Sequence, residues 1–146
     1  MGRIMAIDYG KKRCGIAVTD PLKIIAGALC TVESHNLETF IYDYVNKEPV
    51  ETIVMGYPKR ENGEESENMQ FINPLVERLR KRLSDKHINV VFYDERYTTK
   101  LALQTMIDGG LNRKSRNNKN GTIDRVSATI ILQSYMESSE YKNIIR

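Results

Sequence analysis

The sequence predicts an α/β domain built on one mixed sheet, in which three antiparallel strands come first and parallel strands follow. Short apolar runs separated by turn residues fill the start of the chain, which is typical of hairpin-linked strands. Helical stripes then alternate with further short strands. No linker or internal repeat divides the 146 residues. We therefore expect a single domain over residues 1–146, with helices on both faces of a five-stranded sheet.

Five apolar segments are predicted as strands. The first two flank a polar turn and form a hairpin, and Asp20-Pro21 marks the turn before the third. The fourth and fifth are apolar throughout, as are parallel strands that are buried on both faces. These segments cover residues 4–7, 14–19, 25–32, 52–55 and 89–93.

Helical spacing of apolar residues appears after the third strand. Asn36 is a favoured N-cap for a helix whose stripe is Leu37, Phe40, Ile41, Tyr44 and Val45. In the next helix, Pro74 either kinks the chain or lies in the first turn with Asn73 as its cap. The inward stripe of that helix is Phe71, Ile72, Leu75, Val76, Leu79 and Leu83.

Two further helices are expected in the last third of the chain. A short one begins at Thr98 or Thr99 and ends at Ile107, before a glycine pair. The last runs over about residues 123–136, with Ile123, Val126, Ile130 and Ile131 facing inward.

Composition and charge indicate a globular protein, and the sequence shows no obvious targeting signal. The 22 Lys and Arg against 19 Asp and Glu give a net charge of +3, which neither demands nor excludes a nucleic-acid partner. The apolar run at residues 4–7 is too short for a signal peptide or a membrane span. Cys14 and Cys30 lack metal-binding or redox spacing and suit a reducing compartment. We expect a cytoplasmic protein with no membrane contact.

Acidic residues at the ends of apolar strands are the main functional signal. Asp8 ends the first strand and Asp94-Glu95 ends the fifth. Ligands of open α/β sheets bind beyond the carboxyl ends of strands, so these acids belong to the expected functional edge. Asp124 begins the last helix, where a negative charge also has the simpler role of stabilising the helix by about 0.3–1 kcal/mol.

Four motifs in order resemble one known family. Residues 7–20 (IDYGKKRCGIAVTD) resemble the opening motif of the YqgF family, Holliday junction resolvases of the ribonuclease H-like superfamily. Met55-Gly56-Tyr57-Pro58 resembles the Gly-x-Pro motif of that family, and Asp94-Glu95-Arg96-Tyr97-Thr98 its Asp-Glu-Arg-x-Thr motif. Residues 120–128 are similar to the acidic start of its last helix.

The resemblance implies a ribonuclease H-like fold and a nuclease that depends on divalent metal. Carried over by position, Asp8, Glu95 and Asp124 are the catalytic carboxylates and the metal ligands, with Asp94 as a neighbour. The implied cofactor is Mg²⁺, with Mn²⁺ as an alternative, because two such ions can serve an in-line displacement at phosphorus.

Basic residues near these acids form the second signal. A run of cations without acids directly precedes Asp124, and alone it would indicate only a solvated face. Beside a metal site it becomes a candidate phosphate clamp, which the first hairpin would extend. The candidate nucleic-acid-binding residues are Lys11, Lys12, Arg13, Arg96, Arg113, Lys114, Arg116 and Lys119.

Other polar and aromatic residues keep two roles open. Tyr9 and Tyr97 flank the acids and can either pack in the scaffold or stack on bases. Arg78, Arg80, Lys81 and Arg82 are expected on a solvated helix face, and His35 and His87 on the surface.

The leading hypothesis is a metal-dependent endonuclease acting on structured nucleic acid. The family resemblance offers two substrates, the 5′ end of precursor 16S ribosomal RNA, which we favour, and four-way DNA junctions. The alternative is a nucleic-acid-binding scaffold without catalysis. Asp8-Tyr9-Gly10 also resembles the phosphate hairpin of actin-like ATP-binding proteins, but that architecture needs two such domains. We expect a monomer or a weak homodimer, because no long apolar helix or exposed strand predicts a stable dimer.

Overall fold

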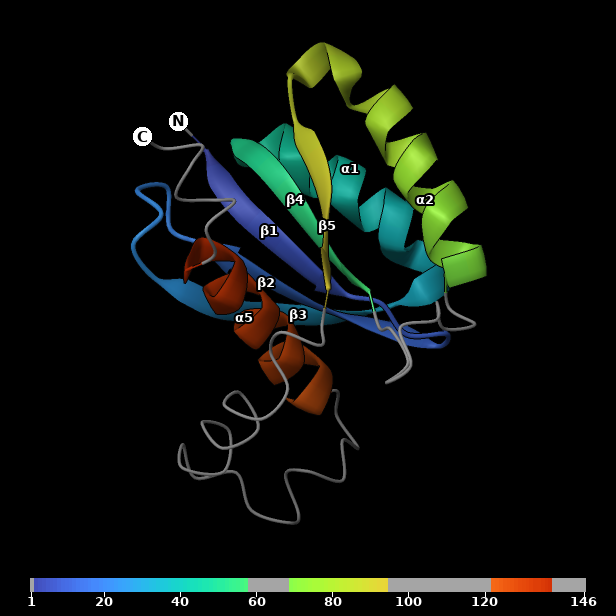
Figure 1. Cartoon of the computed structure of the whole chain (residues 1–146). Helices are drawn as coiled ribbons and strands as arrows, with labels where there is room; N and C mark the ends of the chain where they lie inside the picture. The colour runs from blue at the N-terminus through green and yellow to red at the C-terminus, as the bar shows by residue number, and fades with distance from the viewer. Residues whose placement is uncertain (1, 58–68, 95–121, 138–146) are drawn as a thin grey trace.

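A single sheet between two helical layers forms the frame of the molecule in this computed structural model (Figure 1), which describes residues 2–57, 69–94 and 122–137. Within these residues the strand order is β3-β2-β1-β4-β5. The strands are β1 (Arg3–Asp8), β2 (Arg13–Thr19), β3 (Ala26–Glu33), β4 (Val50–Tyr57) and β5 (Asn89–Asp94).

The mixed character of the sheet is as predicted. β1 pairs antiparallel with β2, and β2 pairs antiparallel with β3. On its other side β1 pairs parallel with β4, which pairs parallel with β5. β1 is therefore central, and the carboxyl ends of β1, β4 and β5 meet at one edge of the sheet.

The helices divide between the two faces. α1 (Leu37–Lys47) and α2 (Met69–Arg82) cover one face, and α5 (Thr122–Glu137) crosses the other (Figure 1). Short 3₁₀ turns at Ser34–Asn36 and Ser84–Lys86 precede α1 and β5. The predicted helix from Thr98 or Thr99 to Ile107 lies outside the described residues.

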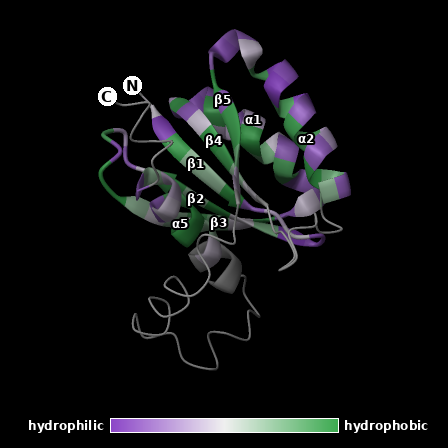
Figure 2. Cartoon of the chain, in the orientation of Figure 1, coloured by the Kyte–Doolittle hydropathy of each residue, from purple (hydrophilic) through white to green (hydrophobic). Residues whose placement is uncertain are grey.

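Alternation along β1 separates two apolar cores. Met5 and Ile7 pack with α1 and α2, whereas Ile4 and Ala6 pack with α5. All four are almost completely buried, and hydrophobic residues predominate in the central strands (Figure 2). This pattern is what a strand covered on both faces requires.

The start of α1 is where it was predicted, but its cap differs. The helix begins at Leu37, yet the side chain of Asn36 makes no capping hydrogen bond. Instead the 3₁₀ turn joins the helix through the Leu37 N–H, which donates to the carbonyl of Ser34. The tighter turn thus uses a backbone donor that a capped helix would leave to a side chain.

α2 corrects two expectations. Of the two alternatives for Pro74, the one with Asn73 as a cap is wrong, because Pro74 lies inside the helix rather than in its first turn. Phe71, predicted on the inward stripe, is 45% exposed, while Met69 is buried. Phe71 falls at the margin of the stripe through Ile72, Leu75 and Leu79, where one step of a helix decides between core and solvent.

The inward face of α5 is broader than predicted. Ile130 and Ile131 are buried as expected, and Ala128, Leu132 and Tyr135 join them. Tyr135 meets Tyr93 of β5 edge to face, with ring centroids 6.3 Å apart. The side chains of Ile123 and Val126 lie outside the described part of the chain.

Candidate functional site

Three parallel strands end together at the edge of the sheet where acids were predicted. In the register, Asp8 pairs with Gly56 and Tyr57 with Asp94. Asp8 and Asp94 thus end strands separated only by β4, two strand spacings or about 9–10 Å apart along the sheet.

Asp8 lies on the face that α5 covers. It continues the alternating set of Ile4 and Ala6, which pack with α5. In β5, Val91 and Tyr93 belong to this same layer, so residue 94 falls in the other alternating set. Glu95, the predicted catalytic residue of this motif, lies outside the described residues.

Both neighbours of Asp8 across the sheet are glycines. Asp8 pairs with Gly15 of β2 and with Gly56 of β4. Directly opposed residues in a sheet share a face, so neither adjacent strand places a side chain beside the carboxylate. The sheet on either side of Asp8 is therefore bare backbone, although both glycines are themselves buried, and the sequence alone did not reveal this for Gly15.

Asp124 lies in the first turn of α5. The helix runs from the sheet end where β1 finishes toward the end where β1 starts (Figure 1). Residue 124 comes one helical turn before Ala128, which is fully buried in the α5 core. The backbone thus brings this position to the same sheet edge as Asp8, while the side chain of Asp124 lies outside the described part.

A short turn carries the predicted cations of the first hairpin. Lys11 and Lys12 are exposed between β1 and β2, and Arg13 is half-buried at the start of β2. Gly10 is required in this turn, because a Cβ there would collide with the carbonyl oxygen of Arg13.

Ser34 fastens this turn to the segment before α1. Its N–H donates to the carbonyl of Lys12 at 2.9 Å, and its hydroxyl donates to the carbonyl of Gly10. The turn is therefore held at both of its ends by one residue from a neighbouring element. The remaining predicted nucleic-acid contacts, which are Arg96, Arg113, Lys114, Arg116 and Lys119, lie outside the described residues.

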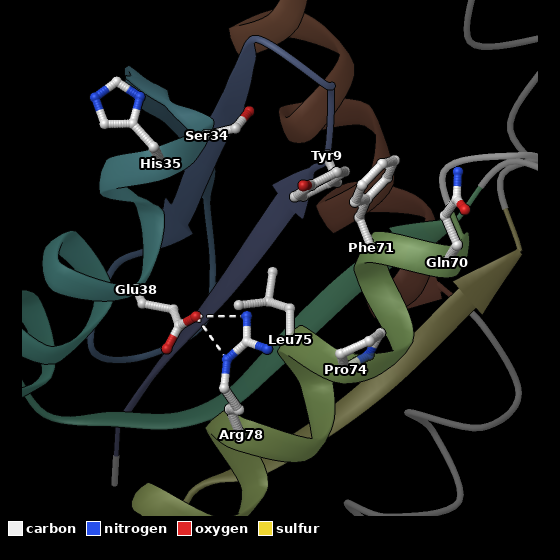
Figure 3. A pocket seen from close by; sticks show the side chains of 9 residues that line it. All are labelled: Tyr9, Ser34, His35, Glu38, Gln70, Phe71, Pro74, Leu75 and Arg78. Carbon is white, nitrogen blue, oxygen red and sulfur yellow. Dashed lines mark hydrogen bonds and ion pairs between the residues drawn. The ribbon is translucent and has the colours of Figure 1, made fainter.

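A pocket of about 400 Å³ opens beside Tyr9, on the α1 and α2 side of the same edge (Figure 3). Tyr9 and Phe71 present their rings to it, and Pro74 and Leu75 form part of its wall. Burial of Tyr9 is the main reason why the pKa of its phenol is raised. The pocket is completed by Ser34, His35, Glu38, Gln70 and Arg78.

Glu38 and Arg78 form an ion pair across this pocket (Figure 3). Oε1 of Glu38 accepts from Nε of Arg78 at 2.8 Å and lies 2.6 Å from a terminal guanidinium nitrogen. This bonding raises the pKa of the Arg78 guanidinium. The sequence could not pair these residues, because they are 40 positions apart.

The basic face of α2 is exposed as expected but is more ordered than a solvated face. Nε and a terminal nitrogen of Arg80 donate to the carbonyl of Val90 at 3.1 and 2.8 Å. The guanidinium of Arg82 lies 3.9 Å from the centre of the Tyr42 ring. His35 and His87 are exposed, as predicted.

Metal-binding clusters and membrane-spanning helices are both absent from the part of the chain that the structure describes. Among the described side chains, no group of three or more His, Cys, Asp or Glu is placed to hold a metal ion. The side chains of Glu95 and Asp124, two of the three predicted ligands, are not among them. Among the described helices, none has the length and apolar content to cross a membrane.

Comparisons with known proteins agree on one family. Residues 2–138 match the family described as "RuvX: Holliday junction resolvase". A protein of Phocaeicola vulgatus is 59% identical over 97% of this chain and 99% of its own length, and one of Bacteroides thetaiotaomicron is 52% identical over 97% and 100%. Both carry the name "Putative pre-16S rRNA nuclease".

Two solved structures share the fold at low sequence identity. The Fowlpox virus resolvase, solved with Holliday junction DNA, has a TM-score of 0.55 at 14% identity and covers 92% of this chain and 97% of its own. T. thermophilus RuvC, also solved with a Holliday junction substrate, has a TM-score of 0.55 at 13% identity, with 93% and 96% covered. These likenesses confirm the predicted ribonuclease H-like fold.

Proposed function

Since the chain belongs to the RuvX family of Holliday junction resolvases, the family that its motifs resemble under the name YqgF, we propose that it is a divalent-metal-dependent endonuclease. The observation that carries this proposal is the position of Asp8. Its carboxylate ends the central strand on the face that α5 covers, between two glycines. A phosphodiester can approach such a carboxylate without meeting side chains from the neighbouring strands.

The other two acids are assigned by pattern. Val91 and Tyr93 alternate toward the α5 layer, and the next residue in that alternation is Glu95. Asp124 precedes Ala128 by one helical turn, and residues four apart share a helix face. Both patterns favour a meeting of Glu95 and Asp124 with Asp8 above the backbone of the two glycines.

The donor set fits Mg²⁺ or Mn²⁺. Three carboxylates offer hard oxygen ligands, and these metals keep further positions for water and phosphate oxygens. When bound, two such ions would activate the attacking water and stabilise the leaving oxygen. Without them, three clustered carboxylates would repel one another. Asp8, Glu95 and Asp124 would hold the ions, and the cations around them would position the backbone of the substrate.

The cations fall into two groups around this edge. Lys11 and Lys12 project from the turn that Ser34 holds, and they would contact phosphates adjacent to the cleaved bond. Arg13 extends this group. Arg96, Arg113, Lys114, Arg116 and Lys119 are the proposed second group, placed by sequence directly after Glu95 and before Asp124.

We favour the 5′ end of precursor 16S ribosomal RNA as the substrate, because relatives at 59% and 52% identity are named "Putative pre-16S rRNA nuclease". A four-way DNA junction is the second candidate, from the family description. Processing of a ribosomal precursor would take place in the cytoplasm. Processing of the precursor requires one active site, which a monomer or a weak homodimer provides. Paired cleavage of a four-way junction requires two active sites.

Cleavage of both substrates by wild type and Asp8→Asn tests the proposal. A labelled 16S precursor leader and a labelled four-way junction would each be incubated with Mg²⁺, Mn²⁺ or EDTA. Substitution of groups that merely support metal ligands costs about 10–100-fold, so we expect loss of a ligand to reduce cleavage by about 100-fold or more.

Asp43→Asn is the matched control, because Asp43 is an exposed aspartate on α1. It should cut at the wild-type rate. Equal metal-dependent cutting by Asp8→Asn and wild type would contradict the catalytic assignment. Binding without cutting by every variant would favour the alternative of a nucleic-acid-binding scaffold.

A further inference from the structure

The pocket beside Tyr9 has a lining that fits a flat, uncharged ligand. Phe71 is 45% exposed although it belongs to an otherwise amphipathic helix, and its ring and that of Tyr9 both line the pocket (Figure 3). Leu75 is 4% exposed and closes the wall behind them. The volume of about 400 Å³ lies within the range of small-molecule sites.

The charges of the pocket exclude phosphate as its preferred occupant. Arg78 is the guanidinium on the wall, but both of its contacts with Oε1 of Glu38 are at 2.8 Å or less. The pair is therefore internally neutralised, and an entering phosphate would face the carboxylate as well as the guanidinium. Exposed aromatic faces, by contrast, stack on nucleobases of any sequence.

Hydrogen-bonding groups lie where the edge of a base could meet them. Gln70 lines the pocket with an amide that can donate and accept. Pro74, one turn later, has no N–H and cannot donate to the carbonyl of Gln70. The carbonyl of Gln70, a residue that lines the pocket, therefore lacks its usual helical donor.

The pocket also lies close enough to Asp8, the proposed catalytic acid, for adjacent nucleotides of one strand to reach both. Tyr9 follows Asp8 directly, with about 3.8 Å between their Cα atoms, and the chain turns there from one face of the sheet to the other. Lys11 and Lys12 project from the same turn, which Ser34 holds against the pocket wall. A strand with a phosphate at Asp8 could therefore send an adjacent base over the sheet edge.

We propose that Tyr9 and Phe71 form a stacking site for one unpaired nucleobase next to the cleaved phosphodiester. This inference rests on the proposed function and extends it: the enzyme recognises a nucleotide that is unstacked from its neighbours. The site selects single-stranded or branched segments over continuous duplex, because a paired base cannot enter it without the cost of unpairing.

Fluorescence of 2-aminopurine tests the stacking site directly. RNA and DNA probes would carry this base at successive unpaired positions, with a fully paired duplex as reference, in EDTA so that no strand is cut. We expect quenching at one unpaired position with wild type. Phe71→Ala should abolish it and weaken binding about fivefold or more, whereas Phe71→Tyr should retain both.

Ile24→Ala is the matched control, because Ile24 is 69% exposed and lies in the turn between β2 and β3. It should quench and bind as wild type does. Absence of quenching at every position with wild type, or equal quenching with Phe71→Ala, would overturn the proposal.

The cleavage assay separates this result from the proposed function. Quenching that depends on Phe71, together with cleavage that does not depend on Asp8, would support the base site and reject the catalytic assignment. Cleavage that depends on Asp8, without quenching, would reject the base site alone.

Discussion

At the scale of single residues, glycine decides how a carboxylate is presented. Asp8 is half-buried between Gly15 and Gly56, which place no side chain beside its carboxylate. The carboxylate oxygens of Asp8 can then contact a phosphate or a metal ion without a neighbouring side chain between them. Glycine weakens a strand by roughly 0.5–1 kcal/mol relative to alanine, so two glycines beside one acid indicate a function that outweighs this cost.

Gly15→Ala tests whether the missing side chain beside Asp8 matters for cleavage. A methyl group beside Asp8 should lower the cleavage rate about tenfold, which corresponds to about 1.4 kcal/mol in activation free energy. Gly27→Ala is the matched control, because a Cβ at Gly27 meets nothing within 4 Å. Single-turnover cleavage rates for the two variants check the prediction, and an unchanged rate for Gly15→Ala would contradict it.

At the scale of elements, turns are held by side chains rather than by their backbone alone. The carboxylate of Asp20 accepts from the N–H groups of Leu22, Ile24 and Ile25 at 3.2, 2.8 and 2.8 Å. These bonds shape the turn between β2 and β3. The bond from Ile25 is the main cause of the lowered pKa of Asp20, relative to the ordinary value of 3.8.

The lowered pKa makes the contribution of Asp20 to stability depend on pH. A depressed folded-state pKa stabilises the protein above the unfolded value of 3.8, and this stabilisation is lost as the pH falls through the folded value. Wild type should therefore exceed Asp20→Asn in urea midpoint at neutral pH, and the difference should shrink below about pH 4. Asp43→Asn is the charge-matched control. A difference that stays constant down to strongly acidic pH would contradict this account.

α5 shows how packing positions an element that carries function. Small residues on both sides of the contact, Ala6 and Ala17 in the sheet and Ala128 in the helix, are all fully buried in one core. Short side chains allow a helix to approach a sheet closely. The first turn of α5, with Asp124, is consequently set by contacts that lie further along the helix.

At the scale of the whole molecule, local clusters of charge matter more than the net charge. A net charge of +3 gives little long-range attraction for nucleic acid. Affinity must then come from cations gathered at one edge, such as those of the β1–β2 turn. Binding of this kind depends steeply on salt, because each neutralised phosphate releases counterions.

Lys12→Ala tests this distribution of charge. If Lys12 contacts a phosphate, the slope of log affinity against log salt concentration should become less negative, by about 0.9 for duplex DNA or about 0.7 for a single strand. Lys47→Ala is the matched control, since Lys47 is exposed at the last turn of α1, and its slope should equal that of wild type. Fluorescence anisotropy over a salt series measures both slopes, and equal slopes for Lys12→Ala and wild type would remove Lys12 from the interface.

The sequence by itself determined the strands, their mixture of antiparallel and parallel pairing, and the candidate site residues at their ends. Continuous apolar runs require burial on both faces, and an acid that ends such a run must lie at an edge of the sheet. Helix limits were also predictable at Leu37 and near Thr122, because apolar spacing and turn residues are local signals.

Only the tertiary structure decided which distant residues meet. The register that puts Gly15 and Gly56 beside Asp8, the Glu38–Arg78 pair and the pocket between Tyr9 and Phe71 all join separate segments. Phe71 illustrates the reason: at the margin of a helical stripe, the same residue can face core or solvent, and the packing of the neighbouring elements determines which. Periodicity records which face of one element is apolar, whereas a site is formed by several elements whose relative positions depend on packing.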